Sequence, residues 1–328
     1  MMTGRKAFRL ALGVAIAALF VWLTLRQVDG ARIAQVLRGA RADYLGAAVL
    51  LLCAGYACRI ARWRTMLARD NPALRWADCA GPLLASFAAN NVLPFRAGDL
   101  MRAFAFNARL HTTAGSVLAT LFVERLLDLL MVILLLGVAL WSFGFDVARL
   151  LGVGGPLLVI AACAIVAVLL RPALLQPIVK LLGLLAGRLP AAARLQAELN
   201  KATGTLVKLA GGSTMWQLLA WSAAAWITEG GVYWLVALAL ASVTAPLGAW
   251  LAVPVGTLAT LIPSTPGYVG TFDYFTAQAM ILAGNEQTAS AAFAFLVHMA
   301  LWLPPTVAGG LYMALRPAGG GAPKEQVS

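Results

Sequence analysis

Charged side chains are scarce in this sequence of 328 residues: Asp, Glu, Lys and Arg make up 12% of it, whereas hydrophobic residues make up 61%. The mean hydropathy of +0.83 lies far outside the range of a water-soluble domain. Short alternating segments, which would indicate a β-barrel, are lacking too. Apolar runs of about 16 to 30 residues recur instead, and helices of this length cross a hydrocarbon core about 30 Å thick. The sequence therefore predicts an all-α polytopic membrane protein.

Side chains suited to catalysis are also few, since the chain has 2 histidines and 13 acidic residues. It contains no nucleophile with an adjacent base, no Gly-rich phosphate loop with Lys and Ser or Thr, and no cluster with metal-ligand spacing. The 4 cysteines lie in or beside apolar runs and are expected to be small core residues: Cys53, Cys58, Cys79 and Cys163. We therefore predict no catalytic residues, no metal and no cofactor, and a function other than that of an enzyme.

The net charge of +12 is strongly basic. In a membrane chain such an excess is explained first by cytoplasmic loops beside anionic lipid head groups, so we expect no nucleic-acid partner. The distribution of Lys and Arg orients the chain with both termini in the cytoplasm. The densest basic stretch is expected to be cytoplasmic and holds Arg59, Arg62, Arg64, Arg69 and Arg75.

The apolar runs predict about six full spans, the first of them uncleaved. They are Leu10–Leu25, Tyr44–Cys58, Thr113–Phe143, Leu151–Leu170, Thr214–Ala241 and Thr288–Leu315. The segment Gln27–Ala42 is expected to lie outside, and the amphipathic linker Arg171–Gly212 to lie on the cytoplasmic face. Residues 1–320 are predicted to form one transmembrane domain, and residues 321–328 a disordered tail.

Two further apolar regions are interrupted by Pro and Gly and predict re-entrant hairpins, with full double crossings as the alternative. In the first, Ala80–Leu93 and Leu100–Phe106 surround the polar break Asn90–Asp99. In the second, Trp250–Ile262 and Val269–Ala283 surround the break Pro263–Gly270. Unpaired backbone groups at bilayer depth are costly unless they line a cavity or are buried in protein.

The two halves have the same order of elements, with a span, a broken hairpin and another span in residues 44–143 and again in 214–315. Thr113–Ser116 with Val123–Arg125 also resembles Thr288–Ala291 with Val297–Met299. An odd number of crossings separates the halves, so the sequence predicts inverted repeats. Chance similarity between hydrophobic helices is the alternative.

The breaks are the predicted substrate-binding regions. Helices restart near Gly98 and Asp99 and near Gly267 and Gly270, and helix N-termini attract anions. Arg96 and Arg102 flank the first restart, and guanidinium groups bind phosphate with paired charge-assisted hydrogen bonds. The alternative is that Arg102 and Arg109 extend to the cytoplasmic interface beneath a purely structural hairpin. The other candidates in the breaks are Asn90, Asn91, Ser264, Thr265 and Asp273.

A second concentration of charge lies within the span Thr113–Phe143, where each ionised residue costs about 2.5 to 3.5 kcal/mol on insertion scales. Glu124 and Asp128 share one helix face, so both can meet Arg96 or Arg102, while Arg125 is expected to point about 100° away. Three interpretations of this pattern remain open. The charges could form an ionic network that binds a ligand, a salt bridge with a purely structural role, or a pair of carboxylates that carries protons. Glu229 and His298 are further ionisable candidates within spans, and a hydrogen-bonded structural histidine is the alternative for His298.

Three motifs in this order resemble one family, the flippase-like transmembrane domain of lysylphosphatidylglycerol synthases, over nearly the whole chain. They are Asn90-Asn91-Val92-Leu93-Pro94-x-Arg96-Ala97-Gly98-Asp99-x-x-Arg102, Val123-Glu124-Arg125-Leu126-Leu127-Asp128 and Pro263-Ser264-Thr265-Pro266-Gly267-x-x-Gly270. Each motif alone is weak, and the combination is specific. Relatives often carry Arg near the position of His298, so this chain departs from the pattern there.

The resemblance implies translocation of aminoacylated phosphatidylglycerol, and stand-alone relatives are linked to hopanoid, glycolipid or polyisoprenoid-phosphate lipids. Only Pro317–Ser328 follows Arg316, so we expect no synthase domain. The leading hypothesis is a translocase of a phosphate-bearing lipid in the bacterial inner membrane, with membrane lipid as substrate and anionic head groups at the cytoplasmic face. The alternatives are a hopanoid or glycolipid transporter, an accessory protein that docks a lipid-modifying enzyme through Arg171–Gly212, and a membrane enzyme using Glu124 and Asp128. A homodimer or a lipid-synthesis enzyme is a possible partner.

Overall fold

A computed structural model describes residues 19, 22, 30–93, 96–106, 109–144, 154–186, 192–262 and 265–315. Every regular element in these ranges is a helix, which confirms the all-α prediction. The helices are α2 (Gly30–Arg38), α3 (Ala42–Leu67), α4 (Trp76–Val92), α5 (Ala97–Phe104), α6 (Ala114–Ser142), α8 (Gly154–Leu170), η2 (Pro172–Leu175), α9 (Gln176–Ala186), α10 (Ala192–Leu209), α11 (Gly212–Ala239), η3 (Pro246–Gly248), α12 (Ala249–Ala259), η4 (Pro266–Tyr268), α13 (Thr271–Leu282) and α14 (Gln287–Leu315).

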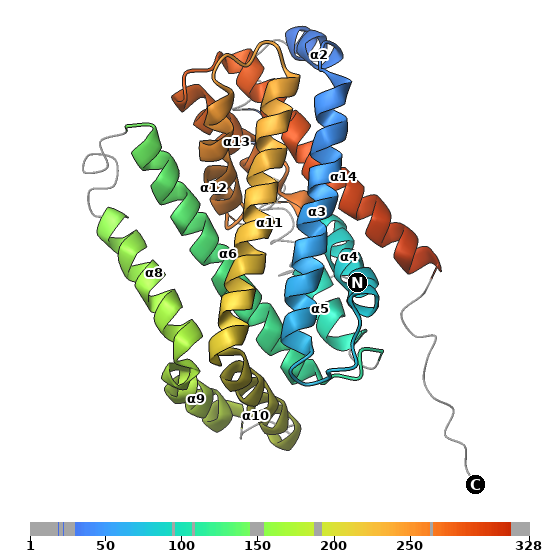
Figure 1. Cartoon of the computed structure of the whole chain (residues 1–328), viewed down its shortest axis with the longest axis vertical. Helices are drawn as coiled ribbons and strands as arrows, with labels where there is room; N and C mark the ends of the chain where they lie inside the picture. Colours follow the sequence, from blue (N-terminus) through green and yellow to red (C-terminus); the bar gives the residue numbers. More distant parts are fainter. Residues whose placement is uncertain are drawn as a thin grey trace. The chain divides into compact units, whose positions relative to one another are not determined.

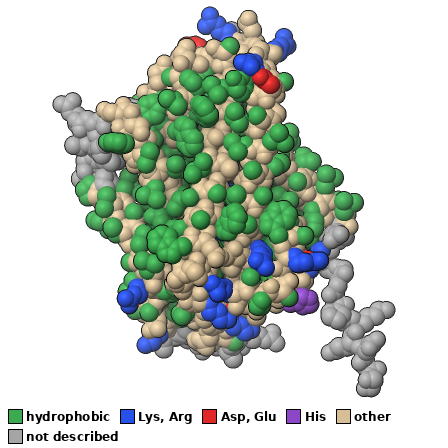
Figure 2. All heavy atoms as spheres, viewed as in Figure 1, with side chains coloured by type: hydrophobic (Ala, Val, Ile, Leu, Met, Phe, Trp, Pro, Cys, Tyr) green, Lys and Arg blue, Asp and Glu red, His purple; other side chains and the backbone are tan. Residues whose placement is uncertain are grey.

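The chain is a membrane protein by the length and composition of its helices. Among the described residues, α3 and α14 are long and apolar enough to cross a bilayer, and Pro156–Leu170 with Pro172–Leu181, bent by 104°, is a third candidate. Figure 2 shows many hydrophobic side chains on the face in view, and many large ones are exposed in the described residues, as expected for a surface in contact with lipid. The predicted first span, Leu10–Leu25, lies outside the described residues except for Leu19 and Trp22.

Each of the other predicted spans falls on one helix, namely α3, α6, α8, α11 and α14. The number of full spans, their orientation and the inverted repeat stay predictions. The tail after Leu315, including Arg316, lies outside the described residues, as do linker residues 187–191.

Helix α3 is longer than predicted, because it continues past Cys58 to Leu67. Nothing in this segment interrupts a helix, and Ala, Arg, Met and Leu all favour one. The helix ends before Asn71 and Pro72, which stop it. The prediction that the helix ends at Cys58 is therefore wrong, while the cytoplasmic position of Arg59, Arg62 and Arg64 stays a prediction.

The chain divides into two compact units. Unit 1 comprises Met1–Cys58, Asp128–Ala162 and Ala223–Pro304, and unit 2 comprises Arg59–Leu127, Cys163–Ser222 and Pro305–Ser328. Each unit contains one of the two helix pairs predicted from the broken apolar regions. The pair α12 and α13 belongs to unit 1, and the pair α4 and α5 belongs to unit 2.

In unit 2, the short helix α5 packs directly against α4 (Figure 1). Close approach is possible because Gly98 has no side chain: a Cβ there would collide with the carbonyl oxygen of Ser86 and the side chain of Asn90. Gly309 of α14 approaches the backbone of Leu84 in the same manner. These contacts hold the first broken pair against the C-terminal part of α14.

In unit 1, α12 and α13 lie side by side (Figure 1). Gly256 allows the approach, because a Cβ there would collide with the Thr276 hydroxyl. Asn285 fixes the far end of the pair: its Oδ1 accepts the Ala245 N–H at 2.8 Å, and its Nδ2 donates to the Ala245 and Met280 carbonyls at 3.1 Å. Tyr233 and Phe293 complete a fully buried core beside Phe272.

The predicted amphipathic linker is helical, as η2, α9 and α10. Helix α10 is fixed to the rest of unit 2 by polar contacts at two points. Asp70 accepts from Lys208 Nζ at 2.6 Å and from the Thr205 hydroxyl at 2.8 Å. Glu198 accepts the N–H of Gly115 in the first turn of α6.

Candidate functional site

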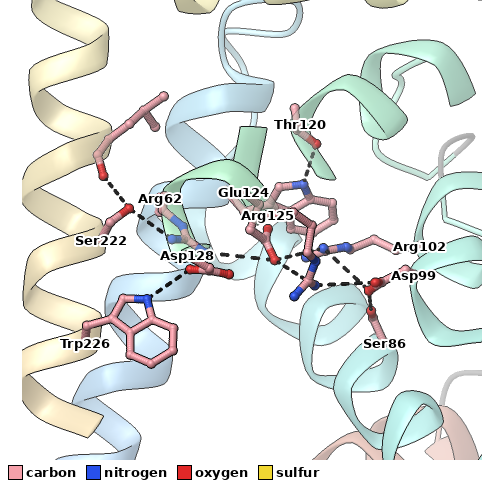
Figure 3. Close-up of polar contacts among 12 residues, drawn as sticks. Arg62, Ser86, Asp99, Arg102, Thr120, Glu124, Arg125, Asp128, Ser222 and Trp226 are labelled. Carbon is pink, nitrogen blue, oxygen red and sulfur yellow. Dashed lines mark hydrogen bonds and ion pairs between the residues drawn. The ribbon is translucent and has the colours of Figure 1, made fainter. Parts of the chain in front are cut away.

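Glu124 of α6 is the common partner of three arginines in unit 2 (Figure 3). Its Oε1 lies 3.1 Å from Arg102 Nη2, 3.5 Å from Arg125 Nη2 and 4.0 Å from Arg62 Nη2. The carboxylate is buried, and its Oε2 has no hydrogen-bond partner among the described residues. A buried carboxylate is stable as an ion only beside such positive charge.

Arg102 of α5 is the most enclosed member of this centre, with 0% of its surface exposed. Its guanidinium lies over the Trp63 ring, 4.8 Å from the centroid, and its Nη2 donates to Glu124. Its Nε and Nη1, which carry most of its N–H donors, have no partner in the part of the chain that the structure describes. The alternative in which Arg102 extends to the cytoplasmic interface is therefore excluded, whereas Arg109 is exposed and donates to the Tyr312 hydroxyl at 2.8 Å.

Arg125 joins the same centre. Its Nη2 lies 3.4 Å from Asp99 Oδ2 and 3.5 Å from Glu124 Oε1, and Figure 3 shows it directed toward these carboxylates. The expectation that Arg125 points away from the hairpin is therefore wrong. The helical angle between neighbouring positions does place its Cβ on another face, but the long arginine side chain spans that difference.

The N-terminus of α5 is held by side chains of α4. The Asp99 N–H donates to Asn90 Oδ1 at 3.2 Å, and the Asp99 carboxylate accepts from Asn90 Nδ2 at 3.0 Å and from the Ser86 hydroxyl at 3.4 Å. Asp99 also places negative charge in the first helical turn, where the helix dipole favours it. The N-terminus of α5 is thus already occupied by the carboxylate of Asp99. The groups nearby that can bind a further anion are the arginines.

Three candidates of the first break differ from their predicted setting. Asn90 and Asn91 lie in the last turns of α4 rather than in the break, because the helix continues to Val92. Asn91 donates to the Thr306 hydroxyl at 2.8 Å, which ties α4 to α14 within unit 2. Arg96 is half-buried and is the residue immediately before α5. Its backbone is left-handed (φ 51°), a conformation that residues other than glycine rarely adopt.

Sequence reasoning missed Arg62 and Trp63 of α3. Both are buried: Arg62 Nη1 donates to the Ser222 hydroxyl at 3.0 Å, and Trp63 Nε1 donates to the Thr120 hydroxyl at 3.1 Å. Counting Arg62 among cytoplasmic loop charges hid it. A signal was present, since the residues after it, Trp63, Met66 and Leu67, continue the apolar pattern of α3 at helical spacing.

In unit 1, the remaining charged candidates on α6 and α11 lie in different settings. The Asp128 carboxylate accepts from Trp226 Nε1 at 3.2 Å. Glu229 is half-buried on α11. Gly230, which follows it, packs closely against the Trp250 ring of α12.

The second break, also in unit 1, brings four of the candidates together: Gly267, Gly270, Asp273 and His298. His298 of α14 lies 2.8 Å from Asp273 Oδ1 through Nδ1 and 2.9 Å from the Gly267 carbonyl through Nε2. Asp273 Oδ2 accepts the Gly270 N–H at 2.9 Å. Thr265 is half-buried and its hydroxyl contacts the Val269 carbonyl at 3.4 Å, while Ser264 lies outside the described residues.

The chemistry available to unit 2 is anion binding at a buried arginine cluster. The carboxylates of this cluster are engaged by guanidinium groups, and Arg102 Nε and Nη1 have no hydrogen-bond partner among the described residues. Buried guanidinium donors favour phosphate or carboxylate ligands. In the described parts of the chain, no three His, Cys, Asp or Glu side chains are grouped so that they could hold a metal ion.

Comparison with known proteins gives two findings. A family model described as the lysylphosphatidylglycerol synthase TM region matches residues 10–309. A protein named glycosyltransferase AglD, from Haloferax volcanii, is 29% identical over 147 residues. That match covers 43% of this chain and 24% of the glycosyltransferase, so the chain corresponds to a minor part of that protein.

Proposed function

This chain belongs to the lysylphosphatidylglycerol synthase transmembrane family, and from this premise we propose that it translocates a phosphate-bearing lipid head group across the bacterial inner membrane. Phospholipids and polyisoprenoid-phosphate lipids are the proposed substrate class. The chain acts as a transporter rather than as an enzyme, and anionic lipids surround its cytoplasmic face.

The observation that carries the proposal is that the Arg102 guanidinium is buried and has N–H donors without a partner among the described residues. A fully buried guanidinium in a membrane protein is costly and is kept where it has a partner or a ligand. Glu124 engages one terminal nitrogen, whereas Nε and Nη1 stay unpartnered among the described residues. These donors suit the oxygens of a phosphate group. The Trp63 indole lies against the guanidinium, with its ring centroid 4.8 Å from Arg102 Cζ.

Glu124 and Asp99 have a second role in this scheme. They neutralise and orient the arginines when no lipid is bound, and a phosphate competes with them for the same donors. A site that exchanges one anion for another binds its ligand weakly enough to release it on the opposite side. This property is required of a carrier, since a ligand held too tightly blocks turnover.

The likeness to a protein named as a glycosyltransferase favours a second candidate, a lipid whose phosphate is attached to a sugar. The arginine centre would still bind the phosphate, and the sugar would add polar contacts. Comparison of a sugar-phosphate lipid with a plain phospholipid in one assay separates the two candidates.

Translocation is tested in proteoliposomes that contain a trace of fluorescent phosphatidylglycerol, with an impermeant quencher added outside. We expect the wild type to expose inner-leaflet lipid to the quencher. Arg102→Lys should slow this by about tenfold or more, because Lys keeps the charge but loses the planar donor set.

The matched control is Arg69→Lys, the same change at an exposed arginine in the loop after α3, and it should translocate at the wild-type rate. Equal rates for Arg102→Lys and the wild type, with both folded and reconstituted to the same density, would contradict the proposal.

A further inference from the structure

The second break contains a histidine whose two ring nitrogens are both engaged. His298 is 6% exposed, with Nδ1 2.8 Å from Asp273 Oδ1 and Nε2 2.9 Å from the Gly267 carbonyl oxygen. The other oxygen of Asp273 accepts the Gly270 N–H at 2.9 Å. The imidazole therefore joins α14, α13 and the break between α12 and α13 within unit 1.

These distances determine how many protons the group holds. A carbonyl oxygen only accepts, so Nε2 must carry a hydrogen. The contact between Nδ1 and the carboxylate then needs one more proton, either on Nδ1 or on Asp273. Without that proton, two lone pairs would face each other at one of the two contacts. The geometry is thus that of a pair that holds one exchangeable proton.

The surroundings of the pair are apolar and aromatic. The Phe272 ring lies 4.9 Å from the imidazole, and Tyr233 of α11 packs at 6.4 Å from Phe272. The other titratable groups on the helices that hold or contact the pair are Glu229 and Tyr233 of α11, Tyr268 of η4, Tyr274 of α13 and, at the far end of α14, Tyr312. The carboxylates of Glu229 and Asp273 both act electrostatically on the buried Tyr233 hydroxyl.

The backbone at the break depends on this histidine. Gly267 is buried with φ 73°, Tyr268 has φ 60° although it carries a side chain, and Gly270 has φ 89°. Such conformations persist only where surrounding contacts hold them. The His298 Nε2–H bond to Gly267 and the Asp273 bond to Gly270 are two of those contacts. Loss of the shared proton leaves one hydrogen on the imidazole. When that hydrogen lies on Nδ1, where it bonds to the Asp273 carboxylate, Nε2 has none to donate to Gly267, and the hold on the break is weakened.

The first half of the chain offers a comparison. Asp99 and Glu124 are separated by the same 25 residues as Asp273 and His298, but their partners are arginines. Guanidinium groups stay protonated in proteins, whereas imidazole gains and loses a proton near neutral pH. The first half thus pairs two carboxylates with guanidinium groups that stay charged, whereas the second half places a carboxylate and an imidazole at the same spacing, and both of these can titrate.

We propose that Asp273 and His298 form a proton-binding site that couples proton movement to lipid translocation. This rests on the proposed function for its role in transport, though not for the binding of the proton itself. Binding adds one proton to the pair and closes both hydrogen bonds of the imidazole. Release leaves a carboxylate and a neutral imidazole whose one hydrogen lies on Nδ1 and bonds to Asp273, so the Gly267 carbonyl is freed.

Proton binding is tested by titration of purified, histidine-labelled protein followed by nitrogen NMR. The chain has 2 histidines, so His111→Gln leaves the signals of His298 alone. We expect the two His298 nitrogens to change together in one step, and the step to disappear in Asp273→Asn. A His298 signal that stays in one neutral form with Nε2 unprotonated throughout would overturn the proposal.

Coupling is tested in proteoliposomes with an imposed pH gradient and the membrane potential clamped. One proton coupled to a gradient of one pH unit can drive up to about tenfold enrichment of fluorescent phosphatidylglycerol in one leaflet. The wild type and His111→Gln should show this enrichment, whereas His298→Gln and Asp273→Asn should give equal leaflets.

Equal leaflets in the wild type, with lipid still crossing, would overturn the coupling and leave translocation standing. A wild type that moves no lipid would defeat both coupling and the proposed function, and the NMR titration would then decide the proton site alone. Enrichment retained in His298→Gln would assign any coupling to another group and overturn the inference.

Discussion

At the scale of single residues, the stability of unit 2 depends on matching buried charge. Glu124 Oε1 neutralises the buried guanidinium groups of Arg102 and Arg62 and the partly exposed one of Arg125, and Arg102 is the most enclosed of the three. Removing one partner of a buried pair leaves the other as an uncompensated charge, which typically costs about 3 to 5 kcal/mol.

Glu124→Gln is therefore expected to lower the free energy of unfolding by about 3 kcal/mol, because the amide keeps the shape but not the charge. The midpoint of thermal unfolding in detergent measures the change. Asp43→Asn is the control, since it removes an ion pair of similar length from an exposed position beside Arg41. A Glu124→Gln midpoint equal to that of the control would show that the arginines are not held by this carboxylate.

A second residue-scale effect concerns the Asp70 contacts of α10, which lie outside the membrane-spanning segments. Burial raises the pKa of Asp70, but hydrogen bonds from Lys208, Thr205 and Ser116 together lower it, and the net pKa lies below the ordinary value of 3.8. The unfolded chain thus takes up the proton first as the pH falls. The stabilising contact is complete above the ordinary pKa and is lost as the pH falls through the folded-state pKa.

Hydrogen exchange checks this account of Asp70. We expect Asp70→Asn to speed exchange in α10 by about fivefold at neutral pH, since loss of a partly exposed ion pair costs on the order of 1 kcal/mol. The wild type should approach the variant only in acid. Unchanged exchange in Asp70→Asn would mean that α10 is held by its apolar contacts instead.

At the scale of elements, the two helix pairs could be predicted from the sequence because Pro and Gly interrupt apolar runs that are otherwise continuous. The pairing of Arg102 with Glu124 was likewise predictable, since an ionised residue within an apolar helix needs a partner. The contacts of Arg62 and Arg125 could not be predicted in this way. Arg62 was counted with the cytoplasmic charges that follow the span, so its contact with Glu124 was not expected. Arg125 points to a different helix face from Glu124, but its side chain is long enough to reach Asp99.

The contact of α5 with α4 supplies an element-scale prediction. Gly98→Ala places a methyl group against the Ser86 carbonyl, so α5 must shift away from α4. We expect a loss of about 1 to 3 kcal/mol. Gly137→Ala in α6 is the control, because nothing lies within 4 Å of its Cβ, and alanine favours a helix by about 1 kcal/mol. A Gly98→Ala variant as stable as Gly137→Ala would contradict the close packing.

At the scale of the whole molecule, the basic excess predicts an orientation in the membrane. In a chain with its four cysteines replaced by alanine, an impermeant thiol reagent applied to intact cells should label Asp43→Cys. Lys201→Cys should react only after the membrane is opened. Both positions are exposed in the structure. Labelling of Lys201→Cys in intact cells would reverse the predicted orientation.

The measurement that tests the central claim most directly is native mass spectrometry of the lipids that copurify with the protein. If the buried arginine centre binds a lipid phosphate, the wild type and Arg69→Lys will retain phosphate-bearing lipid, and Arg102→Lys will lose about nine-tenths of it, as expected for a loss of about 1.4 kcal/mol. Retention of the same lipid in the same amount by Arg102→Lys would contradict the account.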